Sequence, residues 1–153
     1  PEAGFGAIAE DGSTFLNESL VVSIGITEED IRESNSSVLR EIRRRVAEYR
    51  GGRELPRLKG KTAILVDDGL ASGYTMVAAI RMVKNLTPEN TVVAVPVSSG
   101  GAYDLIRSFV DDIVCLHVQE YGEFAVASYY NEFPELSDEE VLELLENARG
   151  NKR

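Results

Sequence analysis

Two adjacent carboxylates and a run of small residues stand together in KTAILVDDGLASGYT, residues 61–75. Residues 62–67, TAILVD, form a short apolar run with β-branched side chains, which predicts a fully buried central strand. This strand ends in Asp67 and Asp68, and a loop of small residues then leads into a predicted helix. Ligands of open α/β sheets bind beyond the carboxyl ends of the strands, so chemistry is expected here first.

The small residues after the acids have the properties of a phosphate-binding loop. Ala71, Ser72 and Gly73 leave the backbone uncovered, so its N–H groups can approach an anion closely. The helix that begins there adds the positive end of its dipole. The hydroxyl groups of Ser72 and Thr75 add hydrogen-bond donors. Together these groups predict a site for a monophosphate.

Asp67 and Asp68 have a different role, because ionised carboxylates accept hydrogen bonds and do not donate them. Such a pair suits a diol, the water shell of a metal ion, or both. A sugar with a phosphate at one end and hydroxyl groups in its middle matches the order of these groups along the chain.

The apolar runs after this segment predict the strands and helices that hold it in position. Residues 91–97, TVVAVPV, and 112–117, DIVCLH, predict two more strands, and helices are predicted over 73–85 and 102–109. Strands that alternate with helices predict βαβ units. The expected fold is therefore α/β, with a doubly wound parallel sheet and helices on both faces. The residues SSGG, 98–101, follow the second strand at the same edge and either contact substrate or form a flexible turn.

Smaller elements are predicted before and after the sheet. The Asp11-Gly12 pair between two short runs predicts a β-hairpin. A Ser-x-x-Glu capping box at Ser137 predicts a C-terminal helix. The predicted ranges are hairpin strands over 5–10 and 14–18, a short strand or helical turn over 19–26, a helix over 27–49 and the C-terminal helix over 138–148.

Composition narrows the class of protein. The length of 153 residues suits one domain, and 43% apolar with 27% charged residues is typical of a soluble globular chain. A net charge of −10 argues against a nucleic-acid partner, and no apolar run approaches the roughly 20 residues needed to cross a membrane. The single cysteine, Cys115, fits a reducing compartment, so we expect a cytoplasmic protein.

The acid pair and the loop resemble the phosphoribosyl pyrophosphate motif of type I phosphoribosyltransferases. In that motif an apolar strand precedes two acids, two further residues and a small-small-Gly-x-Thr loop. The resemblance implies that Asp67 and Asp68 bind the ribose 2- and 3-hydroxyl groups and that catalysis depends on them. It also implies that Mg²⁺ bridges the ribose hydroxyls and the pyrophosphate, with no protein ligand to the metal assigned. The residues it assigns to the 5-phosphate are Ala71, Ser72, Gly73, Tyr74 and Thr75.

A branch of bacterial and archaeal phosphoribosyltransferases is similar over nearly the whole chain. The similar stretches are PEAGFGAIAEDG, LNESLV, YRGG, VVAVPV and FAVASYYNEFPELSDEEV. The resemblance implies that PEAGFG lies in or just after a flexible catalytic loop, and that a first strand and a basic, Gly-containing pyrophosphate loop come earlier. Because the chain starts at Pro1, we expect residues 1–153 to form a single domain that lacks this N-terminal part. Dimers are common in the family, so a homodimer is one expected assembly.

The implied activity is Mg²⁺-dependent transfer of the 5-phosphoribosyl group to a nitrogenous base or a similar acceptor. Ala71 offers no acid or base, which disfavours the 6-oxopurine mechanism in which an Asp at this position handles a proton. Phe124, Tyr129 and Tyr130 are candidates for covering a planar acceptor, or for packing under the C-terminal helix.

Two other functions stay open. The first is a regulatory module that binds phosphoribosyl pyrophosphate or a nucleotide without catalysis. The second is a receiver-like phosphoacceptor domain, which also carries adjacent acids after a strand. A receiver would place a Lys after its last strand, and this sequence has none at that point.

Overall fold

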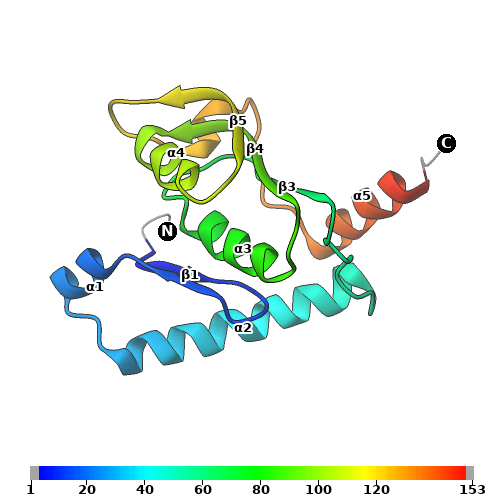
Figure 1. Ribbon diagram of the computed structural model, residues 1–153, viewed down its shortest axis with the longest axis horizontal. Coiled ribbons are helices and arrows are strands. Elements are labelled where there is room, and N and C mark those ends of the chain that lie inside the picture. The colour runs from blue at the N-terminus through cyan, green and yellow to red at the C-terminus, as the bar shows by residue number, and fades with distance from the viewer. Residues whose placement is uncertain (1–3, 151–153) are drawn as a thin grey trace.

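Three parallel strands form the sheet that carries the acid pair, in the order β3–β4–β5 (Figure 1). Leu65 of the first strand pairs with Val93 of the second, which pairs in turn with Ile113 of the third. The strands are β3 (Thr62–Val66), β4 (Asn90–Ser99) and β5 (Asp112–Gln119), connected by the helices α3 (Tyr74–Asn85) and α4 (Gly100–Arg107). The computed structural model describes residues 4–150, so Pro1 to Ala3 of the PEAGFG stretch lie outside the described residues.

The core lies between the sheet and the two crossover helices. The side chains of Val93 on β4, Ile80 on α3 and Ile106 on α4 are fully shielded from solvent. They belong to one apolar cluster that contains residues from β4, α3 and α4. Both helices therefore cover the same face of the sheet and fix the strand ends from which the loops emerge.

β3 lies at an edge of the sheet, so the prediction of a fully buried central strand is wrong, and β4 holds the central position. Ile64 and Val66 are 63% and 74% exposed, and Val114 and Leu116 on β5 are also exposed. Because side chains alternate along a strand, these four project from the face opposite α3 and α4. Within the described residues that face keeps exposed apolar side chains, whereas helices were expected on both faces.

The predicted hairpin is confirmed as β1 (Gly6–Ile8) and β2 (Thr14–Leu16), which pair antiparallel. Its connection is longer than a two-residue turn, because Ala9 N–H donates to the Ser13 carbonyl at 2.8 Å. A Cβ atom at Gly6 would lie 2.4 Å from the Phe15 carbonyl, so this position requires glycine. The hairpin packs against α3, with the Arg81 guanidinium 5.4 Å from the centre of the Phe15 ring.

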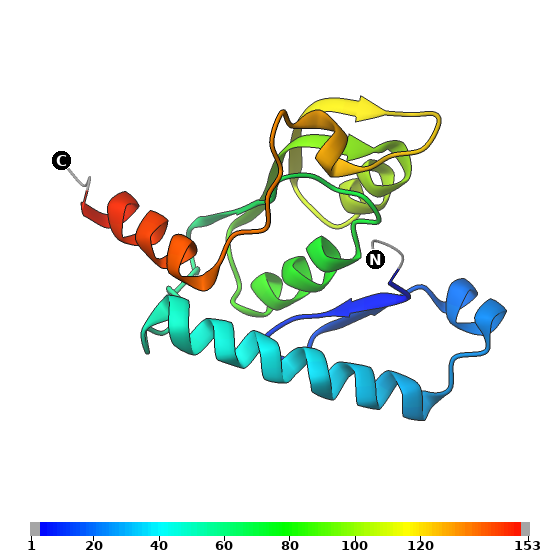
Figure 2. The ribbon, with the colours of Figure 1, turned by 180° about the vertical axis from the view of Figure 1, so that it is seen from behind.

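The remaining helices lie outside the sheet and its two crossovers. They are α1 (Glu18–Ile24), α2 (Glu28–Arg50), the short 3₁₀ helix η1 (Val126–Tyr129) and α5 (Asp138–Gly150). Segment 19–26 is thus helical as far as Ile24, and the predicted helices over 27–49 and 138–148 are confirmed. Figure 2 shows α5 beside the end of α2, where Arg44 Nη1 lies 2.7 Å from the Asp138 carboxylate.

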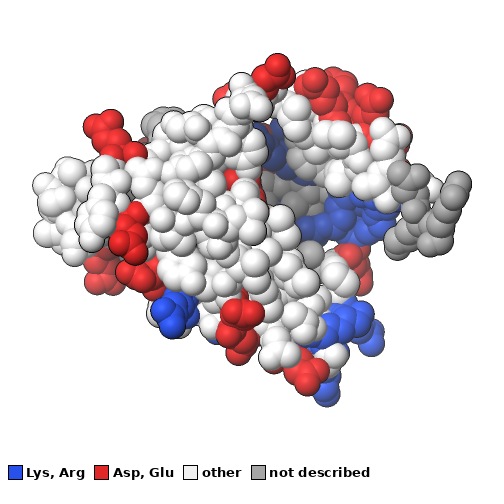
Figure 3. Space-filling view, turned by 90° about the horizontal axis from the view of Figure 1, so that it is seen from above, with Lys and Arg blue, Asp and Glu red and all other residues white. Residues whose placement is uncertain are grey.

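The structure confirms the predicted α/β fold class with its parallel sheet, hairpin and C-terminal helix. On the face seen in Figure 3, acidic side chains are spread over the surface and basic side chains form smaller groups. In the described part of the chain, no helix is both long and apolar enough to cross a membrane.

Candidate functional site

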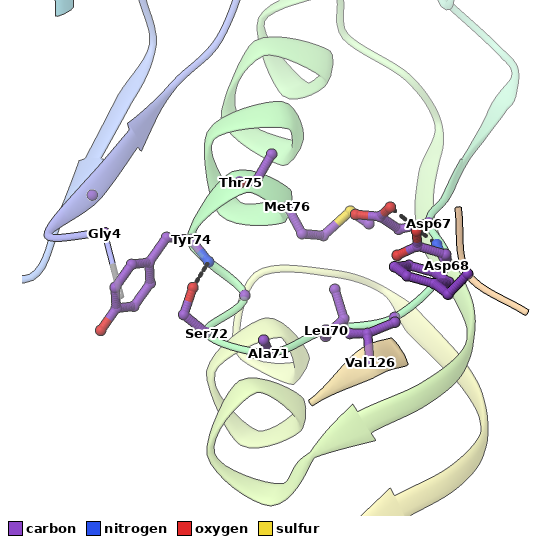
Figure 4. A pocket seen from close by; sticks show the side chains of 14 residues that line it. Gly4, Asp67, Asp68, Leu70, Ala71, Ser72, Tyr74, Thr75, Met76 and Val126 are labelled. Carbon is purple, nitrogen blue, oxygen red and sulfur yellow. Dashed lines mark hydrogen bonds between the residues drawn. The ribbon is translucent and has the colours of Figure 1, made fainter. Parts of the chain in front are cut away.

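The acid pair and the small-residue loop line one cavity of about 360 Å³ beyond the carboxyl end of β3 (Figure 4). Every residue that the sequence assigned to the ribose or to the 5-phosphate lies along it. The other lining residues come mainly from the hairpin, α3 and the segment around η1. The predicted residues are Asp67, Asp68, Ala71, Ser72, Gly73, Tyr74 and Thr75; the others include Gly4, Gly6, Met76, Val126 and Phe133.

The turn after the acids is held close to the sheet. A Cβ atom at Gly69 would lie 2.8 Å from side-chain atoms of both Val97 and Val126, so only glycine fits there. Leu70 then exchanges backbone hydrogen bonds with β4: its N–H donates to the Val97 carbonyl, and its carbonyl accepts from Ser99 N–H. This pairing extends the sheet past the acids and fixes where the loop begins.

The first turn of α3 has no side-chain cap. Its N-cap residue is Gly73, with φ of 77°, a conformation that favours glycine. Tyr74 N–H donates to the Oγ of Ser72, the residue before the N-cap, at 3.4 Å. The first backbone N–H groups of a helix have no intrahelical partner. The residues of this first turn line the cavity, so amides that the loop does not engage are available there to an anion, with the helix dipole behind them.

The start of the loop is anchored from the neighbouring strand. Ser99 Oγ donates to the Ala71 carbonyl at 2.7 Å and accepts from Ala102 N–H at 3.1 Å. Ser99 therefore caps α4 and also ties the start of the small-residue loop to β4. The SSGG segment was predicted either to contact substrate or to form a flexible turn; it forms no separate flexible turn, because Ser98 and Ser99 end β4 and Gly100 begins α4.

The two carboxyl groups differ in their surroundings. Asp67 Oδ1 accepts from the Asp68 N–H at 3.0 Å. Partial burial raises the pKa of the Asp67 carboxyl, the Asp68 N–H opposes this, and the nearby Asp68 charge adds to the rise in pKa. Within residues 4–150 no group of three or more His, Cys, Asp or Glu side chains could hold a metal. Mg²⁺ in phosphate sites usually has one or two carboxylates beside water and substrate phosphates, and Asp67 and Asp68 are the side chains here that could supply them.

An aromatic segment borders the acid end of the cavity. The Tyr130 hydroxyl donates to the Asp68 carbonyl at 2.7 Å, and its ring lies 5.1 Å from that of Phe133. Phe133 lines the cavity. Phe124 and Tyr129, which were also candidates, contact each other instead, with their ring centres 5.5 Å apart. Phe133 was missed, although its place three residues after Tyr130 in an aromatic-rich segment was a usable signal.

Comparison with known proteins supports a single assignment. The family model of the phosphoribosyl transferase domain matches residues 10–131. Two Mycobacterium tuberculosis proteins are each 34% identical to this chain over 148 residues. They are named "Putative phosphoribosyl transferase MT0597" (strain CDC 1551) and "Putative phosphoribosyl transferase Rv0571c" (strain H37Rv). The match covers 97% of this chain and 33% of each relative, so the chain spans about a third of their length.

A solved structure agrees with this match. The crystal structure of TT1426 from Thermus thermophilus is similar with a TM-score of 0.69 and 34% sequence identity. The similarity covers 95% of this chain and 68% of that one. The family match includes β2, the acid pair, the loop and η1, whereas Gly4, Gly6 and Phe133, which also line the cavity, lie outside it. The chain therefore belongs to the phosphoribosyl transferase domain family.

Proposed function

We propose that this chain binds phosphoribosyl pyrophosphate and takes part in Mg²⁺-dependent transfer of its 5-phosphoribosyl group to a nitrogenous base or similar acceptor. The observation that carries the proposal is the shared cavity, in which an uncapped helix N-terminus and two carboxylates lie side by side. Membership of the phosphoribosyl transferase domain family supports the same reaction.

The donor lies along the cavity with its 5-phosphate at the loop. The N–H groups of residues 71–75 and the hydroxyls of Ser72 and Thr75 bind the phosphate oxygens. Asp67 and Asp68 accept hydrogen bonds from the ribose 2- and 3-hydroxyl groups. Asp67 and Asp68 are also the residues that would hold Mg²⁺, which would supply positive charge to the departing pyrophosphate.

The reaction breaks the bond from ribose C1 to a pyrophosphate oxygen and forms a bond from C1 to the acceptor nitrogen. Positive charge develops on the ribose ring as the pyrophosphate leaves. The ionised Asp67 and Asp68 lie beside the ring and stabilise this charge, while the loop holds C1 in position. Phe133 offers an apolar wall for a planar acceptor at the acid end of the cavity. Ala71 supplies no proton-transfer group.

Titration calorimetry with ribose 5-phosphate, and with phosphoribosyl pyrophosphate plus Mg²⁺, tests donor binding. The double variant Asp67→Asn, Asp68→Asn should weaken donor binding by about 100-fold, because two charge-assisted hydrogen-bond acceptors are lost. Asp112→Asn is the matched control. Asp112 also accepts a hydrogen bond from the next residue's N–H, but it begins β5 at the opposite edge of the sheet. Unchanged affinity in the double variant would refute the ribose assignment.

Pyrophosphate release distinguishes transfer from binding alone. The longest available form of the protein is incubated with donor, Mg²⁺ and a panel of nitrogenous bases, and released pyrophosphate is measured. Release with at least one base supports the transferase. Donor binding without release for any base would instead support the regulatory module.

A further inference from the structure

The end of the phosphate loop is connected to a residue far away in the sequence. Asn17, between the hairpin and α1, donates from Nδ2 to the Tyr74 hydroxyl at 2.5 Å, although 57 residues separate the two. Tyr74 is the first residue of α3 and directly follows Gly73. The loop is thus anchored at both ends, by Ser99 at Ala71 and by Asn17 at Tyr74.

Asn17 is held in place by contacts that do not involve Tyr74. Its Oδ1 accepts from Leu20 N–H at 3.0 Å and so caps α1. Its own backbone N–H donates to the Phe5 carbonyl at 2.9 Å. The side-chain amide therefore has a fixed orientation, with Nδ2 directed at the Tyr74 hydroxyl.

The Tyr74 ring is seated in an aromatic cluster on the hairpin side. Its centre lies 5.2 Å from that of Phe15, which lies 6.4 Å from Phe109 in an edge-to-face arrangement. Figure 4 shows Tyr74 pointing away from Asp67 and toward the hairpin. Its side chain therefore does not occupy the space between the acids and the loop, and it contacts the hairpin instead.

We propose that Asn17 is a positioning residue for the phosphate loop and that it acts through the Tyr74 hydroxyl. This inference rests on the proposed function, because it concerns the loop that binds the donor phosphate. Ser72 and Gly73 leave the backbone open but provide little packing of their own. Fixing Tyr74 at both its ring and its hydroxyl sets the direction of the first amides of α3 before the ligand arrives, which favours binding.

The same connection works in reverse. If a well-seated hairpin favours phosphate binding, then bound phosphate stabilises the seating of the hairpin by an equal free energy. Gly4 and Gly6 line the donor cavity, so a stabilised hairpin also closes one wall of the cavity. Donor binding and the order of β2 are coupled through Asn17 and Tyr74.

Two variants remove this hydrogen bond and leave other contacts in place. Tyr74→Phe keeps the ring against Phe15, and Asn17→Ser keeps a hydroxyl that can cap α1 but is too short to reach Tyr74. Each should weaken ribose 5-phosphate binding by about three- to ten-fold, the value of one hydrogen bond. Tyr121→Phe is the control, because it removes a hydroxyl from a side chain that is 85% exposed.

Calorimetry on the single and double variants tests the coupling directly. The double variant should bind no more weakly than Tyr74→Phe alone, and hydrogen exchange in β2 should slow on adding ribose 5-phosphate to the wild type only. Fully additive losses, or wild-type affinity in both single variants, would overturn the role of Asn17. If Asn17→Ser does not fold, Tyr74→Phe decides the question by affinity and by exchange. Failure of the wild type to bind ribose 5-phosphate would instead overturn the proposed function.

Discussion

Two turns beyond the carboxyl ends of neighbouring strands each lead into a helix, and they differ in whether a side chain caps the N-terminus of that helix. After β4, Ser99 Oγ accepts from Ala102 N–H and caps α4. After β3, α3 begins at Tyr74, and its N-cap residue Gly73 offers no side-chain cap. The serine cap satisfies an amide in the first turn of α4, whereas in α3 the Tyr74 N–H makes a longer hydrogen bond of 3.4 Å to Ser72 Oγ and the first turn lines a cavity.

The comparison shows how a binding site differs from a structural turn of similar composition. Both turns are rich in Ser, Gly and Ala, so residue types alone do not separate them. Under the proposed function, the difference lies in which oxygen accepts from the first amides of the helix. After β4 that oxygen is the Ser99 hydroxyl, and after β3 the donor phosphate would provide it. We call the turn after β3, residues 67–73, the open turn and the turn after β4, residues 98–101, the capped turn. The capped turn also holds the open turn in place, because Ser99 Oγ donates to the Ala71 carbonyl.

Closing the open turn should have the largest effect. Gly73→Asp places a side chain at a positive φ, with its Cβ 3.3 Å from that of Ala102, and adds a carboxylate at the proposed phosphate site. We expect donor affinity to fall by about 100-fold or more in calorimetry, because strain and charge repulsion both oppose binding. Gly101→Asp in the capped turn is the matched control, since a Cβ there meets no atom within 4 Å. Equal losses in both variants would show that the two turns do not differ in the proposed way.

Opening the capped turn should have a smaller effect, and mainly on stability. Ser99→Ala removes the cap of α4 and the hydrogen bond to Ala71, so the free energy of unfolding should fall by about 1–2 kcal/mol. Donor binding should weaken only a few-fold, because the phosphate donors themselves remain. Urea unfolding gives the stability, with Ser108→Ala, at the exposed end of α4, as the control. A loss of affinity as large as that of Gly73→Asp would contradict the division of roles.

The acid pair and the small-residue loop could be predicted from sequence, because these residues are consecutive in the chain. The fold class could also be predicted, because the alternation of strands and helices is visible along the sequence. The edge position of β3 could not be predicted, since an apolar run such as that around Ile64 and Val66 looks the same whether or not a neighbour covers it. Burial depends on which elements pack nearby.

Contacts between the site and residues distant in the sequence could not be predicted from sequence patterns either. Tyr130 reaches the Asp68 carbonyl across 62 residues, and Asn17 reaches Tyr74 across 57. Neither pair leaves a periodic or spacing signal along the chain. Asn17 has the sequence preference of a helix cap, and that role is real, but its second hydrogen bond follows only from how the hairpin sits on α3.

The smallest expected effect is the change in the free energy of unfolding when the charge of Asp67, just before the open turn, is removed. At the corresponding end of β4 stands an uncharged group, because Ser98 is fully buried and its hydroxyl donates to the Ser99 carbonyl at 2.9 Å. Asp67 by contrast carries a carboxyl whose pKa is raised by burial. A folded-state pKa above the unfolded value means that the folded protein binds the proton more tightly. Ionised Asp67 therefore destabilises the fold above its folded pKa, and this cost disappears below the unfolded value.

Asp67→Asn should accordingly raise the free energy of unfolding of the ligand-free protein at pH 7, by less than Ser99→Ala lowers it. The gain should shrink as the pH falls through the folded-state pKa of Asp67, where the wild-type carboxyl becomes neutral. Thermal unfolding of both proteins across this acid range measures the difference, with Asp112→Asn as the control. An Asp67→Asn variant that is less stable at pH 7, or a gain that grows toward acid pH, would show that the carboxylate stabilises the fold. The acid pair before the open turn would then stabilise the protein, as the Ser99 cap does, and the two turns would not differ in their effect on stability.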